Sequence, residues 1–372
     1  MKPVPNLSVF GRFRSVYGLI GAVFIIANTF IGAANAETPR WAIAVHGGAG
    51  VIERADLSPE TEAAYRRAMA DAVERGSAVL RAGGSSLDAV EAVIRGMEDD
   101  PLFNAGRGAV FTSEGRNELD ASIMDGRTRG AGSVAGVTTV RHPITLARRV
   151  MERSPHVMMI GEGAEAFART QDLELVDSGF FFTERRWDSL LKELKRRGEP
   201  APARPAGAPP PSGQAGLAPL DERKFGTVGV VALDQHGDVA AGTSTGGTTA
   251  KRWGRVGDAP IIGAGTYADN ASCAVSATGT GEFFIRMTIA RDICALVEYR
   301  GLSIQAAADE VIQRRLTAMP HGDGPSDPRP EGGVIALTPD GQIAFSFNTS
   351  GMYRGAAAWN RPASVAIFKD ED

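Results

Sequence analysis

The stretch DERKFGTVGVVALDQHGDVAAGTSTGG, residues 221–247, contains the most abrupt change of pattern in this 372-residue chain. Charged side chains give way, across a single glycine, to an apolar, β-branched run that starts at Thr227. The runs 228–233 and 239–244 flank a polar turn and predict a β-hairpin. The preceding residues 198–220 are rich in Pro, Ala and Gly, so we expect a flexible linker there. A predicted strand thus begins directly after a predicted linker.

Hydrophobic periodicity and turn signals predict the remaining elements. In the first half we expect a strand at 42–45, helices at 58–80 and from 85 or 86 to 97, strands at 109–111 and 122–124, and a mainly helical segment from 143 to about 197. In the second half, after the hairpin at 228–244, we expect strands at 261–262 and 274–277, helices at 282–299 and 303–318, and a hairpin within 332–351. This order favours two mixed β-sheets covered by helices over a regular βαβ repeat.

Composition and charge are those of an ordinary soluble globular protein. Hydrophobic residues make up 43% of the chain, charged residues 23%, and the formal net charge is −4. The adjacent pairs Arg148–Arg149 and Arg314–Arg315 do not extend into a basic patch. Nucleic acid is therefore not an expected partner.

The first 36 residues have the pattern of an export signal. Basic residues precede an uncharged run over 16–34, and Ala34 and Ala36 frame a cleavage site. We expect cleavage between Ala36 and Glu37, a periplasmic or secreted mature protein, and no stable membrane association once the signal is removed. The alternative is an uncleaved membrane anchor, for which the run is just long enough.

Cysteine and histidine usage narrows the chemistry. Cys273 and Cys294 are too few for a disulfide framework in a chain of this size, and the helical pattern around Cys294 predicts a core position. Neither has the nearby histidine pattern of a thiol nucleophile. The five histidines show no metal-binding spacing such as HExxH, so a transition-metal site is not expected.

Threonine and glycine are dense in the second half of the chain. Besides Thr227 it contains TSTGG at 243–247, GRVGDAP at 254–260 and TGTGE at 278–282. Each alone is typical of a strand edge or a turn. In this order behind a linker, and with HGGAG, PLFNAGRGAVFT, ELDASIMDG, AGSVAGV and SPHVMMIGEGAEAFA in the first half, they make the chain resemble the isoaspartyl peptidase/plant-type L-asparaginase family of N-terminal nucleophile hydrolases.

The resemblance implies an α+β fold, the four-layer αββα sandwich of the N-terminal nucleophile hydrolase type, and a precursor that cleaves itself between Gly226 and Thr227. Both fragments would form one domain, and two processed protomers would associate as an (αβ)2 heterotetramer. The implied segments are a signal peptide at 1–36, an alpha subunit at 37–226 with its linker at about 198–220, and a beta subunit at 227–372.

Thr227 would then be both nucleophile and base. Its hydroxyl would attack the Gly226 carbonyl, convert the amide into an ester, and leave a free threonine amine after hydrolysis. Glycine leaves that carbonyl sterically open and tolerates strained backbone angles. An N-terminal amine has a reference pKa of about 7.7 to 8.0, which suits it to act as the general base for its own hydroxyl.

The resemblance assigns further roles by position. Thr245 would hydrogen-bond the nucleophile, and Thr278 with the backbone N–H of Gly279 would bind substrate and form the oxyanion hole. No cofactor is required, but the loop MEDDPLFNAGR resembles the family's sodium-binding loop. A structural sodium ion would be held there by the backbone carbonyls of Met97, Glu98, Asp100, Phe103, Ala105 and Arg107.

Substrate recognition would use one charged partner for each end of an amino acid. Arg255 would take the α-carboxylate in a bidentate fork and Asp258 the α-ammonium, although an ordinary surface ion pair explains the same two residues. Asn104 would lie near the active site, where a turn residue is an almost equally good explanation. The stretch GGTTAKRWGRVGD departs from the family pattern at Ala250 and in the bulky pair that follows Lys251, which leaves the substrate preference open.

The implied function is an autoproteolytically activated threonine amidohydrolase. Its small-molecule substrates would be L-asparagine, hydrolysed to L-aspartate and ammonia, and β-aspartyl (isoaspartyl) dipeptides. One alternative is a glycosylasparaginase, whose usual context has aspartate where this chain has Gly226. A more distant alternative is a periplasmic amino-acid-binding protein, which would use Arg255 and Asp258 without any chemistry.

Overall fold

The computed structural model describes residues 40–210, 226–322, 324 and 327–371. The predicted signal peptide, and the part of the predicted linker from residue 211 onward, lie outside the described residues.

Two β-sheets face each other at the centre of the fold. The larger has the strand order β12-β11-β1-β5-β6-β2-β3-β4 and the smaller the order β10-β9-β8-β7. Among the described residues every strand pair is antiparallel except β3 with β4. The strands are β1 (Ala42–Gly50), β2 (Leu119–Asp125), β3 (Ala131–Val137), β4 (Met158–Ile160), β5 (Val228–Leu233), β6 (Val239–Thr245), β7 (Thr266–Ala268), β8 (Ala274–Gly279), β9 (Gly332–Leu337), β10 (Ile343–Phe347), β11 (Gly351–Ala358) and β12 (Arg361–Phe368).

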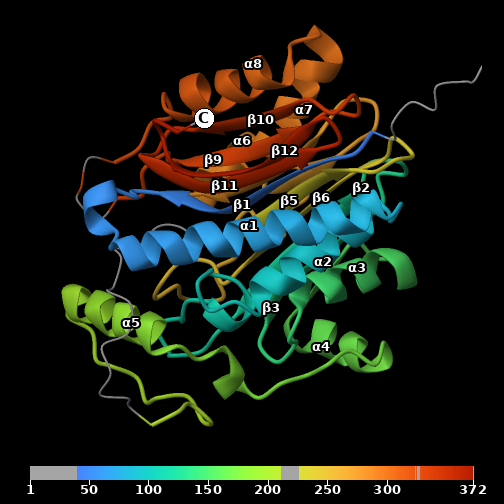
Figure 1. Ribbon diagram of the computed structural model, residues 1–372. Helices are drawn as coiled ribbons and strands as arrows, with labels where there is room; N and C mark the ends of the chain where they lie inside the picture. Colours follow the sequence, from blue (N-terminus) through green and yellow to red (C-terminus); the bar gives the residue numbers. More distant parts are fainter. Residues whose placement is uncertain (1–39, 211–225, 323, 325–326, 372) are drawn as a thin grey trace, which may run out of the picture. The chain divides into compact units, whose positions relative to one another are not determined.

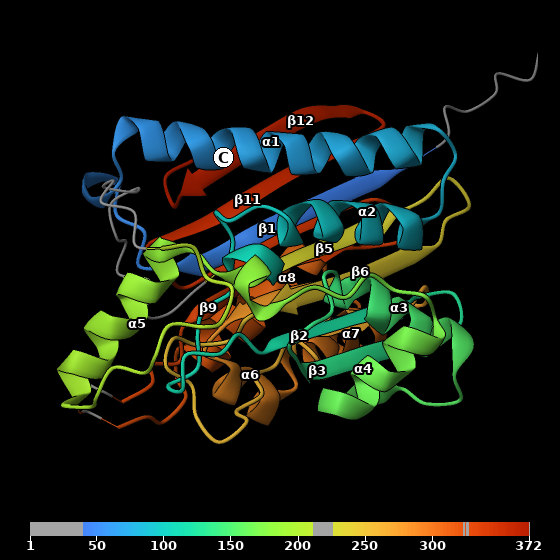
Figure 2. The ribbon, with the colours of Figure 1, turned by 90° about the horizontal axis from the view of Figure 1, so that it is seen from below.

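Helices cover the outer face of each sheet (Figures 1 and 2). Helices α1, α2 and α3 pack on the larger sheet, whereas α7 and α8 pack on the smaller one. The order helix, sheet, sheet, helix confirms the predicted αββα sandwich. The helices are α1 (Pro59–Arg81), α2 (Ser86–Glu98), α3 (Pro143–Arg153), α4 (Gly161–Thr170), α5 (Glu184–Arg197), α6 (Gly281–Met287), α7 (Ile289–Arg300) and α8 (Ile304–Asp309), with a π-helix over Glu310–Leu316 and short 3-10 turns at Arg54–Asp56, Gly106–Gly108 and Ser178–Phe181.

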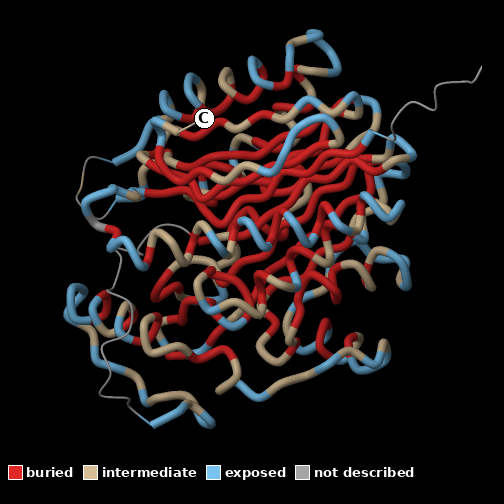
Figure 3. The backbone as a smooth tube through the Cα atoms, viewed as in Figure 1, coloured by how far each residue is buried: buried red, intermediate tan, exposed pale blue. Residues whose placement is uncertain are grey.

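The central strands of the larger sheet, such as β1 and β5, are buried on both faces, and alternation decides which layer each side chain enters (Figure 3). In β1, Ile43 and Val45 pack toward the helices, whereas the smaller Ala42 and Ala44 pack toward the second sheet. Successive side chains point to opposite faces of a strand. His46 therefore points between the sheets, as do alternate residues of the neighbouring strands.

Local capping signals explain where the first helices begin. The Ser58 side chain accepts a hydrogen bond from the Thr61 N–H, with Pro59 at the first helical position. Ser85 and Asp88 form a capping box at the start of α2. Both starts agree with the sequence prediction, because a cap depends only on residues within one turn.

Several predicted elements are wrong or interrupted. Residues 109–111 are irregular rather than a strand, and the chain forms a strand at 266–268 instead of 261–262, where Ile262 makes a single bridge. The predicted helix from 143 onward is divided by the edge strand β4, which pairs with β3. The pattern of exposed apolar residues there fits a helix or a strand, and pairing with the sheet edge decides it.

The later helices are also divided. Thr288 adopts the left-handed conformation with φ of 49°, which ends α6 and starts α7 within the predicted 282–299 helix. The predicted 303–318 helix continues from α8 into a π-helix. In the predicted linker, Arg204 forms an ion pair with Glu184, so its first part packs on the fold rather than extending freely.

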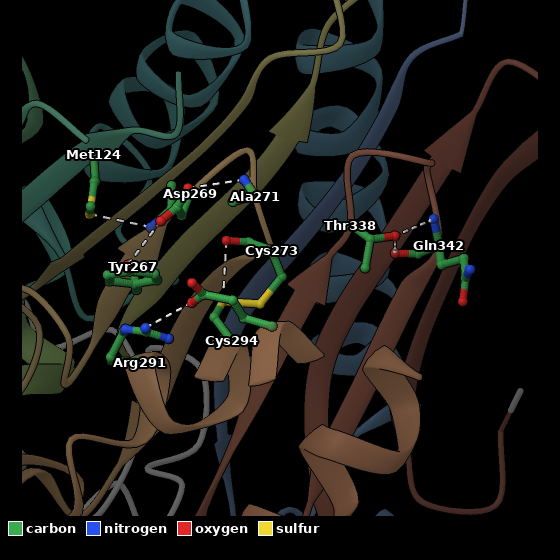
Figure 4. The surroundings of a disulfide bond; sticks show 11 residues. Met124, Tyr267, Asp269, Ala271, Cys273, Arg291, Cys294, Thr338 and Gln342 are labelled. Atoms are coloured by element: carbon green, nitrogen blue, oxygen red, sulfur yellow. Dashed lines mark hydrogen bonds and ion pairs between the residues drawn. A yellow bond between two sulfur atoms is a disulfide. The ribbon is translucent and has the colours of Figure 1, made fainter. Parts of the chain in front are cut away.

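One disulfide joins Cys273 to Cys294 (Figure 4). Cys273 immediately precedes β8, and Cys294 lies on α7 with its side chain fully buried, as predicted. The sequence did not indicate this pairing, since the two residues are brought within 5.4 Å, Cα to Cα, only when α7 packs on the smaller sheet. The bridge therefore ties the helix layer to the strand that ends at Gly279.

No helix among the described residues is long and apolar enough to cross a membrane.

Candidate active site

The junction singled out by the sequence lies at the start of β5, where two threonines meet. The Thr227 hydroxyl donates to Thr245 Oγ1 at 3.0 Å. The register of β5 and β6, which pairs Val228 with Ser244, accounts for this contact, because the residues one step further along are then opposite each other. The predicted hydrogen bond between these two threonines is present in the structure.

Thr278 enters the same layer from the other sheet. It lies two residues beyond Ser276 on β8, and so on the same side of that strand. Its hydroxyl is buried and has no hydrogen-bond partner among the described residues. Gly279 follows with φ of +156°, and a Cβ there would lie 2.5 Å from the Glu331 carbonyl oxygen. A buried hydroxyl without a partner next to a glycine backbone is a suitable donor site for a developing oxyanion.

Next to these residues, between the sheets, hydroxyl groups from four strands and the His46 ring of a fifth form one buried hydrogen-bonded chain. His46 Nε2 lies 2.9 Å from Ser276 Oγ, and the contacts continue through the hydroxyls of Thr243, Thr266 and Ser122 at 2.7, 2.6 and 2.7 Å. Burial lowers the pKa of His46 to about 3, although the backbone of Thr227 acts in the opposite direction. His46 is therefore neutral, and it stabilises the site through its contact with Ser276 rather than through a charge.

Asn104 holds the carbonyl that precedes Thr227. Its backbone N–H donates to the Gly226 oxygen at 3.1 Å. Its side chain is fixed on both sides, because Oδ1 accepts from the Val110 N–H at 2.9 Å and Nδ2 donates to the Gly247 oxygen at 2.8 Å. Asn104 thus contacts the predicted cleavage junction, which a turn residue need not do.

The backbone at the junction leaves no space for a side chain on Gly226. A Cβ there would lie 2.4 Å from the Cβ of Asn104. From the other side, a Cβ on Gly48, whose φ is +111°, would lie 2.8 Å from the Gly226 Cα. Both positions require glycine for close approach of the backbones.

The predicted recognition pair is not an ordinary surface ion pair. Arg255 makes a bidentate ion pair with Glu282 through Nε at 2.9 Å and Nη2 at 3.0 Å. Asp258 is buried, and its Oδ2 has no hydrogen-bond partner in the part of the chain that the structure describes. Burial raises the pKa of the Asp258 carboxyl to about 7, although the positive charge of Arg255 acts to lower it. A buried carboxylate without a partner can receive a cation.

Three residues near the site were missed by the sequence argument. His46 and Glu282 lie in quoted motifs, HGGAG and TGTGE, but nothing local reveals their partners. Lys251 is buried, donates from Nζ to the Glu118 carbonyl oxygen at 2.9 Å, and lies 3.9 Å from the Asp120 carboxylate. Asp120 is itself paired in register with Thr245. The only sequence signal for Lys251 was its position directly after Ala250, where the chain departs from the family pattern.

The predicted sodium loop, residues 97–107, turns its backbone inward. Cβ atoms built on Gly106 and Gly108 would lie 2.2 Å from the Glu98 oxygen and 2.0 Å from the Phe103 oxygen. Other carbonyls accept backbone hydrogen bonds, those of Met97 from Asp100 at 3.2 Å, Asp100 from Phe103 at 3.3 Å and Ala105 from Gly108 at 3.1 Å. Oxygen-only ligation suits hard cations, but three of the predicted carbonyls already accept a backbone hydrogen bond within the loop.

The same loop is tied to β6, the strand that ends at Thr245, by a side chain. Glu98 Oε1 accepts from the hydroxyl of Ser244, the residue before Thr245, at 2.6 Å. No group of three or more His, Cys, Asp or Glu residues that could hold a metal ion occurs within the described ranges. Ion binding by the backbone oxygens of this loop stays a prediction.

Comparisons with known proteins agree with this geometry. The asparaginase family model (Asparaginase_2) matches residues 39–367. The chain is 52% identical to an isoaspartyl peptidase of Salmonella typhimurium, over 88% of this chain and 98% of that protein. It is 43% identical to a probable isoaspartyl peptidase/L-asparaginase of Arabidopsis thaliana (88% and 99%) and 40% identical to a plant-type L-asparaginase of Pyrococcus furiosus (84% and 94%). The chain belongs to the asparaginase family of N-terminal nucleophile hydrolases.

Proposed function

We propose that this protein is a threonine amidohydrolase that activates itself by cleavage between Gly226 and Thr227, then hydrolyses L-asparagine and β-aspartyl dipeptides. The observation that carries the proposal is the junction itself. The Thr227 hydroxyl is hydrogen-bonded to Thr245, and the carbonyl that it must attack is hydrogen-bonded to the Asn104 N–H. The names of the relatives support the choice of substrates.

Cleavage would begin with attack of Thr227 Oγ1 on the Gly226 carbonyl carbon. The Asn104 N–H would stabilise the negative charge that develops on the Gly226 oxygen, since it already donates to that atom. Collapse of the intermediate breaks the C–N bond, passes a proton to the Thr227 nitrogen and leaves an ester. Water then hydrolyses the ester, which releases the Gly226 carboxylate and restores the Thr227 hydroxyl beside a free amine.

Substrate hydrolysis would use the same hydroxyl with a different base. The free Thr227 amine accepts the hydroxyl proton as Oγ1 attacks the side-chain amide carbon of the substrate. Thr278 and the Gly279 N–H stabilise the oxyanion, and ammonia or an amino acid leaves with the proton. Arg255 and Asp258 bind the α-carboxylate and α-ammonium. Water hydrolyses the acyl-enzyme to aspartate.

We also propose a bound sodium ion and export from the cytoplasm. A sodium ion on the carbonyls of 97–107 would supply a fixed positive charge that holds the loop against β6, where Glu98 meets Ser244. The Cys273–Cys294 disulfide supports export, because disulfides persist mainly in oxidising compartments. Assembly as (αβ)2 stays a prediction.

The test of self-cleavage is denaturing electrophoresis of the purified protein with N-terminal sequencing of both fragments. We expect the smaller fragment to begin Thr-Val-Gly-Val and the larger to begin at Glu37. Thr227→Ala should stay intact and inactive because it lacks the nucleophile, while Thr227→Ser keeps a hydroxyl and should cleave slowly. An intact wild-type chain, or cleavage at another bond, contradicts the proposal.

Product analysis separates the alternatives. We expect aspartate to be released from L-asparagine and from a β-aspartyl dipeptide. Preferred turnover of a glycosylated asparagine would instead identify a glycosylasparaginase. Binding of amino acid without release of aspartate would identify a binding protein.

A further inference from the structure

We propose that Glu282 is a positioning residue for substrate recognition, which holds Arg255 away from Asp258 so that one receives the α-carboxylate and the other the α-ammonium. The inference rests on the proposed function. Its basis is the bidentate pair in which Glu282 binds Nε and Nη2 of Arg255 at 2.9 and 3.0 Å. This pair occupies one edge of the guanidinium and leaves Nη1 for a ligand.

The glycines around Arg255 show that its guanidinium lies in a closely fitted place. A Cβ built on Gly257 would lie 2.7 Å from Nη1, and one built on Gly281 would lie 2.9 Å from Nη2. The guanidinium can lie this close to the backbone only because both positions lack side chains. Glu282 follows Gly281 directly, so the same turn that makes room for Arg255 also supplies its partner.

The free edge of Arg255 is directed toward the nucleophile. A Cβ on Gly247 would lie 3.5 Å from Nη1, and the Gly247 N–H donates to Thr245 Oγ1 at 3.0 Å. Thr245 in turn accepts from Thr227. A carboxylate bound at Nη1 is therefore close to the reacting hydroxyl, as an α-carboxylate must be when the amide is only two carbons away.

Without Glu282, Arg255 has an obvious competing partner. Asp258 is three residues away, buried, and its Oδ2 has no hydrogen-bond partner in the described part of the chain. The charged groups that act on Asp258 are Arg255, Glu282 and Asp120. Removal of Glu282 would let Arg255 pair with Asp258. Each side chain would then neutralise the charge of the other, and neither charge would be available to the substrate. Glu282 is half-exposed, so it reaches this position at lower desolvation cost than a buried carboxylate.

The test compares Glu282→Ala and Glu282→Gln with wild type, using L-asparagine, after each protein has cleaved itself. We expect KM to rise about 10- to 100-fold, the range for loss of one charged hydrogen bond, with kcat changed less than about threefold. Glu282→Asp should recover part of the loss, because it restores the charge on a shorter side chain. Glu298→Ala, which removes the partner of Arg291 on α7, is the matched control and should leave KM unchanged.

A second readout separates positioning from general damage. When Arg255 turns to Asp258, the Asp258 pKa falls, so the acid limb of the kcat/KM profile should move to lower pH in both variants. Self-cleavage involves no α-carboxylate and should proceed at the wild-type rate. Wild-type KM in either variant, or loss of kcat at constant KM, would overturn the inference. An inactive wild-type enzyme would instead refute the proposed function.

Discussion

The two ends of the candidate site are built in different ways. The end that holds the proposed nucleophile, called the nucleophile end, consists of Thr227, Thr245 and Thr278. Their side chains are uncharged and lie at the ends of paired strands, next to a buried layer of hydroxyls. The proposed recognition end consists of Arg255 and Asp258 on a loop and Glu282 at the start of a helix. Arg255 and Glu282 form an ion pair, and Asp258 Oδ2 has no hydrogen-bond partner among the described residues.

This difference teaches which quantity each end controls. Strand register sets the spacing of the threonines, so changes there should affect the rate of the chemical step. The charges of the loop respond to the ligand and to pH, so changes there should affect binding. This division would be contradicted if substitutions at both ends altered the same kinetic constant.

Among substitutions that keep Thr227, the largest effect is expected from Asp258→Asn. The substitution keeps the shape and removes the charge that would pair with the α-ammonium. Loss of one partner from a buried charged pair costs about 2 to 5 kcal/mol, so kcat/KM for L-asparagine should fall roughly 30- to 5000-fold, mainly through KM. Steady-state kinetics measure this, with Asp340→Asn in the β9–β10 turn as the control. A fall in kcat at unchanged KM would contradict the division.

At the nucleophile end, Thr278→Val removes a hydroxyl and keeps the branched shape. Loss of one oxyanion donor costs roughly 100- to 1000-fold in rate, so kcat should fall by that factor while KM stays within about threefold. Thr280→Val is the control, since Thr280 makes no side-chain cap hydrogen bond at the start of α6. A rise in KM with unchanged kcat would show that Thr278 serves binding only.

The pH profile should distinguish the two ends within one enzyme. Asp258 must be ionised to bind an ammonium, and its pKa is raised to about 7 by burial, so below pH 7 it is protonated and binding is lost. The Thr227 amine must be neutral, with a reference pKa of about 7.7 to 8.0. Log kcat/KM should therefore fall with a slope approaching two below pH 7, whereas log kcat falls with a slope of one.

In Asp258→Asn the slope of log kcat/KM should drop to one, because only the amine remains to titrate. A slope of two in that variant would show that a different group titrates at the recognition end.

The smallest effect on chemistry is expected from the disulfide. Both cysteines lie in the predicted beta subunit, so the bridge does not join the two fragments. A loop of this length contributes about 3 kcal/mol in the chain-entropy account. Cys294→Ala should lower the free energy of unfolding by about that amount in a denaturant titration and leave kcat/KM within about twofold. A large loss of activity would show that the bridge also positions Gly279 at the end of β8.

Much of the fold followed from local signals. The starts of α1 and α2 and the β5–β6 hairpin depend on residues close together in the sequence, and they were predicted closely. The strand predicted at 42–45 is present, but β1 continues through the glycine-rich residues to Gly50 because β11 pairs with it there. The predictions failed where the same pattern permits two structures. Residues 158–160 became an edge strand because β3 offers a partner, and Thr288 interrupts a pattern that reads as one helix.

The site shows the same limit. The motifs predicted the contact between Thr227 and Thr245, which the structure shows. They predicted Asn104 only near the site, and its hydrogen bond to the Gly226 oxygen comes from the structure. They did not reveal that Arg255 pairs with Glu282, that Lys251 is buried beside Asp120, or that His46 ends a chain of hydroxyls between the sheets. Each of those contacts joins residues that only the packing of different elements brings together.

The sequence alone determined the abrupt passage from linker to strand at Gly226–Thr227, because glycine, β-branching and hydrophobic alternation act over a few neighbouring residues. Only the tertiary structure decided how that junction is surrounded. The spacing of two packed sheets places Thr278 opposite the nucleophile's strand. In the part of the chain that the structure describes, Asp258 Oδ2 is buried without a hydrogen-bond partner, and the close approach permitted by Gly257 and Gly281 brings Arg255 to Glu282. These are contacts between distant segments, and their energies depend on burial and distance that no local pattern encodes.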